Sequence, residues 1–271
     1  VCAKEGSAKF VGEILVNHGY EDVASMLSGI KAWGNLLAPI RLNDGEDYEL
    51  YQFRRPGKAS CSYGLIFGNE MMLFDPSKNV AAYQTFAEER GLAITRTFET
   101  HRQADYISGS QKLMTATGAK IMAPEPDFSV ARFPYSKVGD NEVFTFSSGG
   151  PEVKAVHTPG HTPGHLAFYV PEADLLFTAD VDLTSFGPFY GHDFADIDEF
   201  IQSIERLRRL NARIVATGHA GPFNGQVKEK FSAYENIVYH RDRLILEQLK
   251  QPKTLDDFRG RNLIFRSYPD Y

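Results

Sequence analysis

The sequence reads Glu99-Thr100-His101-Arg102-Gln103-Ala104-Asp105-Tyr106-Ile107-Ser108-Gly109 directly after the apolar run 94–98. A short apolar run followed by polar residues predicts a buried strand that ends where the polar residues begin. His101 and Asp105 therefore lie in a loop at the carboxyl end of that strand. Because imidazole and carboxylate groups are common metal ligands in proteins, this stretch predicts a metal-binding loop.

Three later segments also place a histidine or an aspartate beside a short apolar run. They read Thr158-Pro159-Gly160-His161-Thr162-Pro163-Gly164, then Phe177-Thr178-Ala179-Asp180, then Thr217-Gly218-His219-Ala220-Gly221. Each comes with a short apolar run that predicts a strand. Loops at the ends of successive strands thus offer five metal-ligand side chains, which are His101, Asp105, His161, Asp180 and His219.

Two imidazoles and one carboxylate form the ligand set of non-haem Fe(II) oxygenases, which leaves coordination positions open for substrate and oxygen. His101, His161 and Asp180 supply this set, and we predict them as metal ligands. Asp105 and His219 have two interpretations. They are either ligands of a second metal or groups that orient the first, and we favour the second interpretation.

The ordered series of loops resembles the metallo-β-lactamase superfamily, whose first loop reads Thr-His-x-His-x-Asp-His. This chain matches the first histidine, the aspartate and the trailing Ser-Gly, and it has Gln103 and Tyr106 at the other two histidine positions. The resemblance implies an α/β fold, an αββα sandwich of two sheets with helices outside. A complete site in this superfamily holds two metals. Glutamine offers only a carbonyl oxygen, and tyrosine must first lose a proton with a pKa of about 10, so the substitutions argue against a dinuclear zinc site.

The sequences of the loops around His101 and His161 are similar to those of the persulfide dioxygenase branch of that superfamily. This resemblance extends over roughly residues 45–225. In that branch the iron ligands correspond to His101, His161 and Asp180. The resemblance implies one Fe(II) per chain, and O2 and a small-molecule thiol persulfide, such as glutathione persulfide, as substrates. Sulfite and a thiol are the implied products. The predicted catalytic groups beside the metal are Asp105, Tyr106 and His219.

Two rival functions stay open on the sequence. The first is a Zn(II)-dependent hydrolase of the glyoxalase II type, which cleaves a thioester with metal-bound hydroxide. The second is a degenerate member of the same fold that binds a thiol metabolite or a partner without turnover. His165, Tyr190 and His192 lie close to the motif loops and either line the pocket or lie on the surface, which is the default for each.

Residues 1–36 resemble the C-terminal part of a rhodanese domain, with Cys2 where that family's sulfur-carrying cysteine begins its loop. Cys2 either carries a persulfide or is inert, whereas Cys61, in an apolar run, is expected to be a buried hydrophobe. We predict a linker and first strand at residues 37–56, and a metallo-β-lactamase-like domain at 57–271. Rhodanese domains transfer sulfane sulfur, so this partial rhodanese-like segment favours the persulfide interpretation.

The composition narrows the classes of partner. The 271 residues are 42% hydrophobic, which is enough for a large core, and the net charge of -6 argues against nucleic acid. The apolar runs are far shorter than the roughly 20 residues of a membrane helix, so no membrane association is expected. With two cysteines, a disulfide framework is excluded, and we expect a cytoplasmic protein. The oligomeric state is open, with a homodimer as one candidate.

Overall fold

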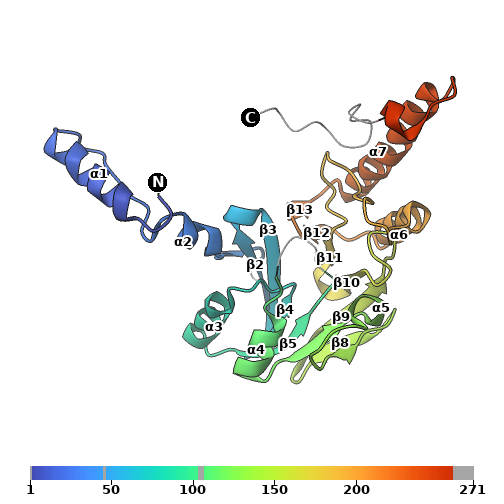
Figure 1. Ribbon diagram of the computed structural model, residues 1–271. Coiled ribbons are helices and arrows are strands. Elements are labelled where there is room, and N and C mark those ends of the chain that lie inside the picture. The colour runs from blue at the N-terminus through green and yellow to red at the C-terminus, as the bar shows by residue number, and fades with distance from the viewer. Residues whose placement is uncertain (1, 45–46, 103–106, 259–271) are drawn as a thin grey trace. The chain divides into compact units, whose positions relative to one another are not determined.

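The computed structural model describes residues 2–44, 47–102 and 107–258 (Figure 1). The chain divides into two compact units. The first consists of Val1–Phe98 with Asp105–Ile121, and the second of Glu99–Ala104 with Met122–Tyr271. Each unit is described by itself below.

A seven-stranded sheet follows the chain order from β1 to β7. Its strands are β1 (Ala38–Arg41), β2 (Tyr48–Arg55), β3 (Ser60–Phe67), β4 (Glu70–Phe74), β5 (Ala93–Phe98), β6 (Lys120–Ala123) and β7 (Ser136–Lys137). The first four pair antiparallel, and β5 pairs parallel to β4 because the helix α3 (Val80–Glu89) provides the crossover between them. Gly68, at a positive φ of 58°, turns the chain between β3 and β4.

The core of the first unit lies between the strands, α3 and α4 (Ser110–Thr117). Tyr83 of α3 is fully buried among Phe53, Leu73 and Leu113. Its hydroxyl is 2.6 Å from Ser62 Oγ and accepts a 2.9 Å hydrogen bond from the Ser77 amide. A buried phenol needs such partners, because an unpaired polar atom in the core costs about 1–3 kcal/mol. Cys61 is buried, as predicted.

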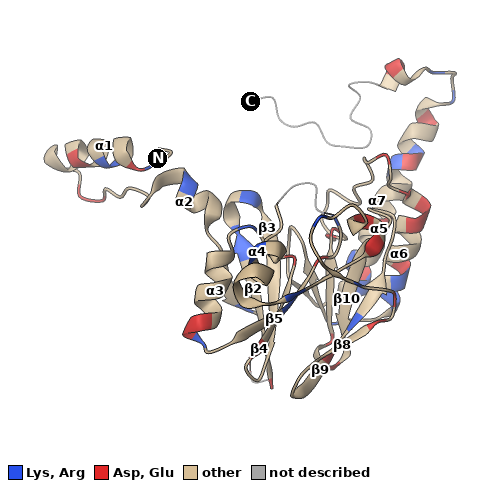
Figure 2. Ribbon diagram, turned by 60° about the horizontal axis from the view of Figure 1, so that its bottom comes forward, with Lys and Arg blue, Asp and Glu red and all other residues tan. Residues whose placement is uncertain are grey.

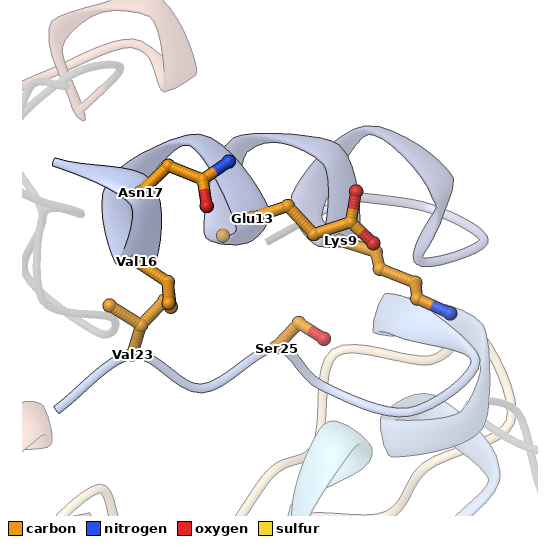
Figure 3. A pocket seen from close by; sticks show the side chains of 7 residues that line it. Lys9, Glu13, Val16, Asn17, Val23 and Ser25 are labelled. Carbon is orange, nitrogen blue, oxygen red and sulfur yellow. The ribbon is translucent and has the colours of Figure 1, made fainter. Parts of the chain in front are cut away.

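The N-terminal segment forms two helices, α1 (Gly6–Asn17) and α2 (Gly29–Asn35), but α1 buries none of its residues. The Ile30 amide donates to the Cys2 carbonyl at 2.9 Å, which ties the start of α2 to the loop before α1. A hollow of about 400 Å³ lies beside α1 and is lined by Lys9, Gly12, Glu13, Val16, Asn17, Val23 and Ser25 (Figure 3).

The second unit is built on a six-stranded sheet with the order β13-β12-β11-β10-β9-β8. The strands are β8 (Val143–Phe146), β9 (Gly149–His157), β10 (Leu166–Val170), β11 (Leu175–Ala179), β12 (Ile214–Thr217) and β13 (Phe223–Asn224). All pairs are antiparallel except β11 with β12, which are joined by the helix α6 (Ile197–Arg209). The short helix α5 (Glu125–Phe128) and the long helix α7 (Val227–Gln248) complete the unit.

The helix α6 shows why this sequence forms a helix against a sheet. Asp196 caps its N-terminus by accepting hydrogen bonds from the Asp198 and Glu199 amides, both at 2.9 Å. Phe200, Ser203, Ile204 and Leu207, at helical spacing, are its buried residues. Acidic and basic residues both occur along α6 and α7 (Figure 2). None of the described helices combines the length and apolarity that crossing a membrane requires.

The predicted α/β class with two sheets is confirmed, with local differences. The helix α4 begins at Ser110, where Gly109 takes the N-cap position and its amide donates to the Pro76 carbonyl. Short elements without clear periodicity were not predicted, namely β1, β6, β7, β13 and α5. The predicted domain ranges 1–36, 37–56 and 57–271 stay a prediction.

Gly160 lies where the second motif loop approaches α6 closely enough to exclude a side chain. It has a φ of 123°, and an added Cβ would lie 2.3 Å from the backbone N and Cα of Phe200. Since backbone atoms cannot move aside as a flexible side chain does, we expect Gly160→Ala to lower the free energy of unfolding by about 2–4 kcal/mol. Gly139→Ala, where nothing lies within 4 Å of the added Cβ, is the matched control. Equal urea midpoints for the two variants would contradict this packing.

The ion pair of Asp140 with Arg206 predicts a pH dependence of stability. Burial acts to raise the pKa of Asp140, but hydrogen bonds from Arg206 and the His157 amide outweigh it and hold this pKa below its ordinary value. A lowered folded-state pKa adds stability that is present above the unfolded-state value and is lost as pH falls through the folded-state value. Because the pair is half-exposed, we expect about 0.5 kcal/mol, lost below about pH 4.

The check is urea denaturation of the wild type and Asp140→Asn across that range of pH. The difference in unfolding free energy between them should shrink as the pH falls. Asp242→Asn, at an exposed position of α7, should show no such trend. A constant difference for Asp140→Asn would show that the charge of Asp140 is irrelevant to stability.

Candidate metal centre

His101, His161 and Asp180 come together in the second unit. One ligand atom of each lies within 4.8 Å of the others. Asp180 Oδ2 is 3.2 Å from His161 Nε2 and 3.7 Å from His101 Nε2. Both imidazoles are buried, at 1% and 4% exposure, whereas the Asp180 side chain keeps 19%. The three residues predicted as metal ligands from separate loops thus form one cluster.

Backbone hydrogen bonds hold the His101 loop in place. The Glu99 amide donates to the Met122 carbonyl at 2.9 Å, and the Thr100 carbonyl accepts from the Leu166 amide at 2.8 Å. The segment that carries His101 is therefore fixed between β6 and the start of β10. His161 lies in the turn that joins β9 to β10, and Asp180 directly follows β11.

A carbonyl oxygen fixes the tautomer of His161. His161 Nδ1 lies 3.0 Å from the Phe189 carbonyl oxygen, which can only accept, so Nδ1 carries a proton. In the neutral imidazole Nε2 then presents a lone pair, and this lone pair faces the Asp180 carboxylate. Two acceptors facing each other at 3.2 Å require a positive charge between them or a second proton on the ring. The donor set therefore fits a metal cation.

The pKa shifts of His101 and Asp180 also fit a metal-binding site. Burial lowers the pKa of His101 to about 4, against the opposing effect of Asp180. Burial also acts on Asp180, but the neighbouring His101, His161 and His219 outweigh it and hold the pKa of Asp180 well below its ordinary value. The cluster thus keeps a neutral imidazole and an ionised carboxylate, the protonation states that metal ligands require.

His219 lies on the other side of the Asp180 carboxylate. Its Nε2 is 3.5 Å from Asp180 Oδ1, whereas His101 and His161 face Oδ2. The His219 amide donates to Asp182 Oδ1 at 3.1 Å. Burial, together with the nearby Asp180 charge, raises the pKa of Asp182 to about 7. Sequence reasoning missed Asp182, although it stands only two positions after a predicted ligand.

His165 is fully buried beside the cluster, so the default surface position is wrong for this residue. Its ring centre is 5.1 Å from that of His101, and its Nδ1 is 2.8 Å from Thr158 Oγ1. Its Nε2 is buried and has no hydrogen-bond partner among the described residues. Burial, with His101 and His161 nearby, holds the pKa of His165 well below its ordinary value, so the ring is neutral.

Asp127, which the sequence analysis missed, joins two of the motif loops. Its Oδ2 accepts from the Arg102 amide at 2.9 Å, directly after His101. Its Oδ1 accepts from the Gly164 amide at 2.7 Å, in the His161 turn. One carboxylate therefore sets the separation of the two histidine loops. Local sequence gives no signal for this role, because both partners are backbone groups far away in the chain.

Two aromatic rings, those of His192 and Phe194, lie next to the cluster and are called the aromatic rim here. The His192 ring centre lies 5.6 Å from that of His161 and stacks on Phe194 at 4.9 Å. The guanidinium carbon of Arg102 is 5.1 Å from the centre of the Phe194 ring. His192 is half-buried beside His161, which fits a pocket-lining position. Gln103, Asp105 and Tyr106 lie outside the described residues, so the catalytic roles of Asp105 and Tyr106 stay a prediction.

The two hydrogen bonds that Asp127 accepts from the histidine loops, here called the Asp127 clamp, predict that Asp127→Asn binds metal more weakly. The amide keeps one acceptor oxygen but turns an NH2 group toward a backbone N–H, so one loop is released. We expect the dissociation constant for Fe(II) or Zn(II) to rise about 10- to 100-fold, measured by competition with a chromophoric chelator. Glu125→Gln, at an exposed position of the same helix, is the control. Unchanged affinity in a folded Asp127→Asn protein would contradict the clamp.

Solved structures share this fold at low sequence identity. A metallo-beta-lactamase from Staphylococcus aureus aligns with a TM-score of 0.62 and 24% identity, covering 84% of this chain and 75% of that chain. ETHE1 from Myxococcus xanthus aligns with a TM-score of 0.55 and 20% identity, covering 79% and 98%. Identities this low show the fold alone.

Curated relatives match a shorter part of the chain. The hydroxyacylglutathione hydrolase of Cereibacter sphaeroides is 32% identical over 134 residues, 49% of this chain and 51% of that protein. That of Brucella anthropi is 30% identical over 124 residues, 45% and 47%. The chain thus spans about half the length of these relatives.

The family match extends over more of the sequence. The Metallo-beta-lactamase superfamily matches residues 57–219, more than half of the chain, and this range contains the first three motif loops and the fourth as far as His219. The two mixed sheets with their helices are consistent with the expected αββα sandwich. The chain belongs to the metallo-β-lactamase superfamily.

Proposed function

We propose that this chain is a mononuclear non-haem iron dioxygenase that oxidises a low-molecular-weight persulfide. The observation that carries the proposal is the cluster of two imidazoles and one carboxylate from His101, His161 and Asp180. This donor set is typical of Fe(II) sites that keep coordination positions open. The persulfide substrate is supported by the sequences of the His101 and His161 loops and by the resemblance of the N-terminal segment to part of a rhodanese domain.

The overall reaction balances with one water. One persulfide, one O2 and one H2O give one thiol, one sulfite and released protons, so the outer sulfur is oxidised and dioxygen is reduced. When bound, Fe(II) would supply a redox-active centre with open coordination positions for persulfide and O2, while the outer sulfur provides the electrons that reduce O2. His101, His161 and Asp180 would hold the metal.

The chain's own residues orient this chemistry. The Phe189 carbonyl directs His161 Nε2 toward Asp180, and Asp127 holds the two histidine loops together. His165 places a neutral imidazole with a buried Nε2 beside His101. Asp105 and Tyr106 belong to the proposal as groups that orient the metal ligands and donate a hydrogen bond to substrate.

A second candidate is a zinc-dependent thioester hydrolase. Asp180 presents Oδ1 to His219 and Oδ2 to the other two histidines, as a carboxylate that bridges two metals does. The curated relatives named above are hydroxyacylglutathione hydrolases. The two candidates differ in metal, in oxygen consumption and in substrate, so one set of measurements separates them.

We expect protein purified without oxygen to contain iron and to consume O2 on addition of a persulfide, with sulfite as product. His161→Ala removes one ligand and should lower this rate by at least about 100-fold. His240→Ala, at an exposed position of α7, should keep the wild-type rate. An oxygen electrode and a sulfite assay measure both quantities.

Three outcomes are distinguishable. Zinc content without oxygen uptake, together with chelator-sensitive thioester cleavage, would replace the dioxygenase by the hydrolase. Folded protein that binds no metal and turns over neither substrate would favour a non-catalytic binding protein. Iron content with oxygen uptake that survives His161→Ala would reject the assigned ligand set.

A further inference from the structure

Arg102 is an exposed arginine that directly follows the predicted metal ligand His101. Its backbone amide donates to Asp127 Oδ2 at 2.9 Å. Its guanidinium carbon lies 5.1 Å from the centre of the Phe194 ring, and Phe194 is itself 40% exposed. The backbone of Arg102 is therefore fixed beside the cluster, and the charged end of its side chain lies over the aromatic rim.

The aromatic rim connects Arg102 to the cluster. The Phe194 ring stacks on His192 at a centre-to-centre distance of 4.9 Å, and the His192 ring centre lies 5.6 Å from that of His161. All of these residues belong to the second unit. A ligand that lies along the rim therefore extends from a predicted metal ligand at one end to the Arg102 guanidinium at the other.

The segment that leads into the rim is held by Arg241 of α7, which is buried at 3% exposure. Its Nη1 donates to the Pro188 carbonyl at 2.7 Å, and its Nη2 donates to the Phe186 carbonyl. Its guanidinium carbon lies 5.4 Å from the centre of the Tyr190 ring. A surface whose backbone is already fixed loses little conformational entropy when a ligand binds. The rim is therefore suited to recognise one part of a small molecule.

The contact with Phe194 leaves the hydrogen-bond donors of Arg102 available. A benzene ring attracts the cation through its quadrupole but offers no lone pair to the five N–H donors of the guanidinium. No ion pair or side-chain hydrogen bond joins this guanidinium to the described residues. The nearby Asp127 carboxylate instead accepts from two backbone amides. Arg102 thus presents a planar fork of donors, which matches the two oxygens of a carboxylate.

We propose that Arg102 is a specificity-determining residue, which binds a carboxylate of the substrate while the reacting sulfur lies at the cluster of His101, His161 and Asp180. The substrate class is then an anionic thiol derivative whose carboxylate lies several bonds away from its sulfur. A tripeptide thiol, at about 3.5 Å per residue, is long enough to extend along the rim. The place of the sulfur rests on the proposed function, whereas carboxylate binding by Arg102 requires no metal.

The test compares S-methylglutathione, which carries free carboxylates and no free thiol, with its diethyl ester. Because the sulfur is methylated, binding depends on neither metal nor turnover. Arg102→Gln removes the charge and keeps a polar side chain, whereas Arg102→Lys keeps the charge and loses the fork. Arg243→Gln, at an exposed position of α7, changes the net charge by the same amount and is the matched control.

Isothermal titration calorimetry of the full chain gives the dissociation constants. We expect the wild type and Arg243→Gln to bind the acid about 10-fold more tightly than the ester, because hydrogen bonds between charged groups are stronger than neutral ones. Arg102→Gln should lose most of this preference, and Arg102→Lys should keep part of it. Phe194→Leu retains the charge but removes the ring beneath it, so it should lower the preference less than Arg102→Gln does.

The second readout is oxygen uptake with glutathione persulfide. Arg102→Gln should act mainly on KM and raise it about 10-fold, because a contact remote from the reacting sulfur is equally strong in the ground state and the transition state. An unchanged preference for the acid in Arg102→Gln, an unchanged KM, or no binding of the acid by the wild type would overturn the inference. A preference that depends on Arg102 in protein without oxygen uptake would keep the inference and reject the proposed dioxygenase.

Discussion

The carboxylate of Asp180, placed among three imidazoles, is the constraint on which the rest of the centre depends. Its oxygens lie 3.2–3.7 Å from Nε2 of His101, His161 and His219. A charged group in such a site requires a compensating positive charge, because removing an ion from water costs several kcal/mol. Burial lowers the pKa of His101, whereas at His161 hydrogen bonds to Asp180 and the Phe189 carbonyl outweigh burial and raise the pKa. Either a protonated His161 or a bound cation supplies the compensating charge.

The surrounding structure keeps the ligands in place by backbone hydrogen bonds. Asp127 ties together the His101 and His161 loops, and the Phe189 carbonyl sets the orientation of His161. Arg241 in turn fixes the segment that carries Phe189. Such outer groups commonly change metal affinity as strongly as 10- to 100-fold. The positions of the predicted metal ligands therefore depend on three groups outside the cluster, which are Asp127, the Phe189 carbonyl and Arg241.

The sequence predicted the α/β class, the strands that precede the motif loops, and the three clustered side chains. It could do so because His101, His161 and Asp180 follow apolar runs, and strand ends bring such residues together. It missed Asp127 and Arg241, since their partners are amides and carbonyls dozens of residues away, which carry no side-chain signal. The expected surface position of His165 was wrong for a related reason. Only the fold shows that β10 begins at this histidine's neighbour and carries it into the interior.

The central claim is that one metal ion binds at His101, His161 and Asp180. Its most direct test is an anaerobic titration of the metal-free protein with Fe(II), followed by equilibrium dialysis and metal analysis. The account predicts saturation at one ion per chain in the wild type and no saturable binding in Asp180→Asn. Saturation at two ions per chain, or unchanged binding in Asp180→Asn, would contradict it.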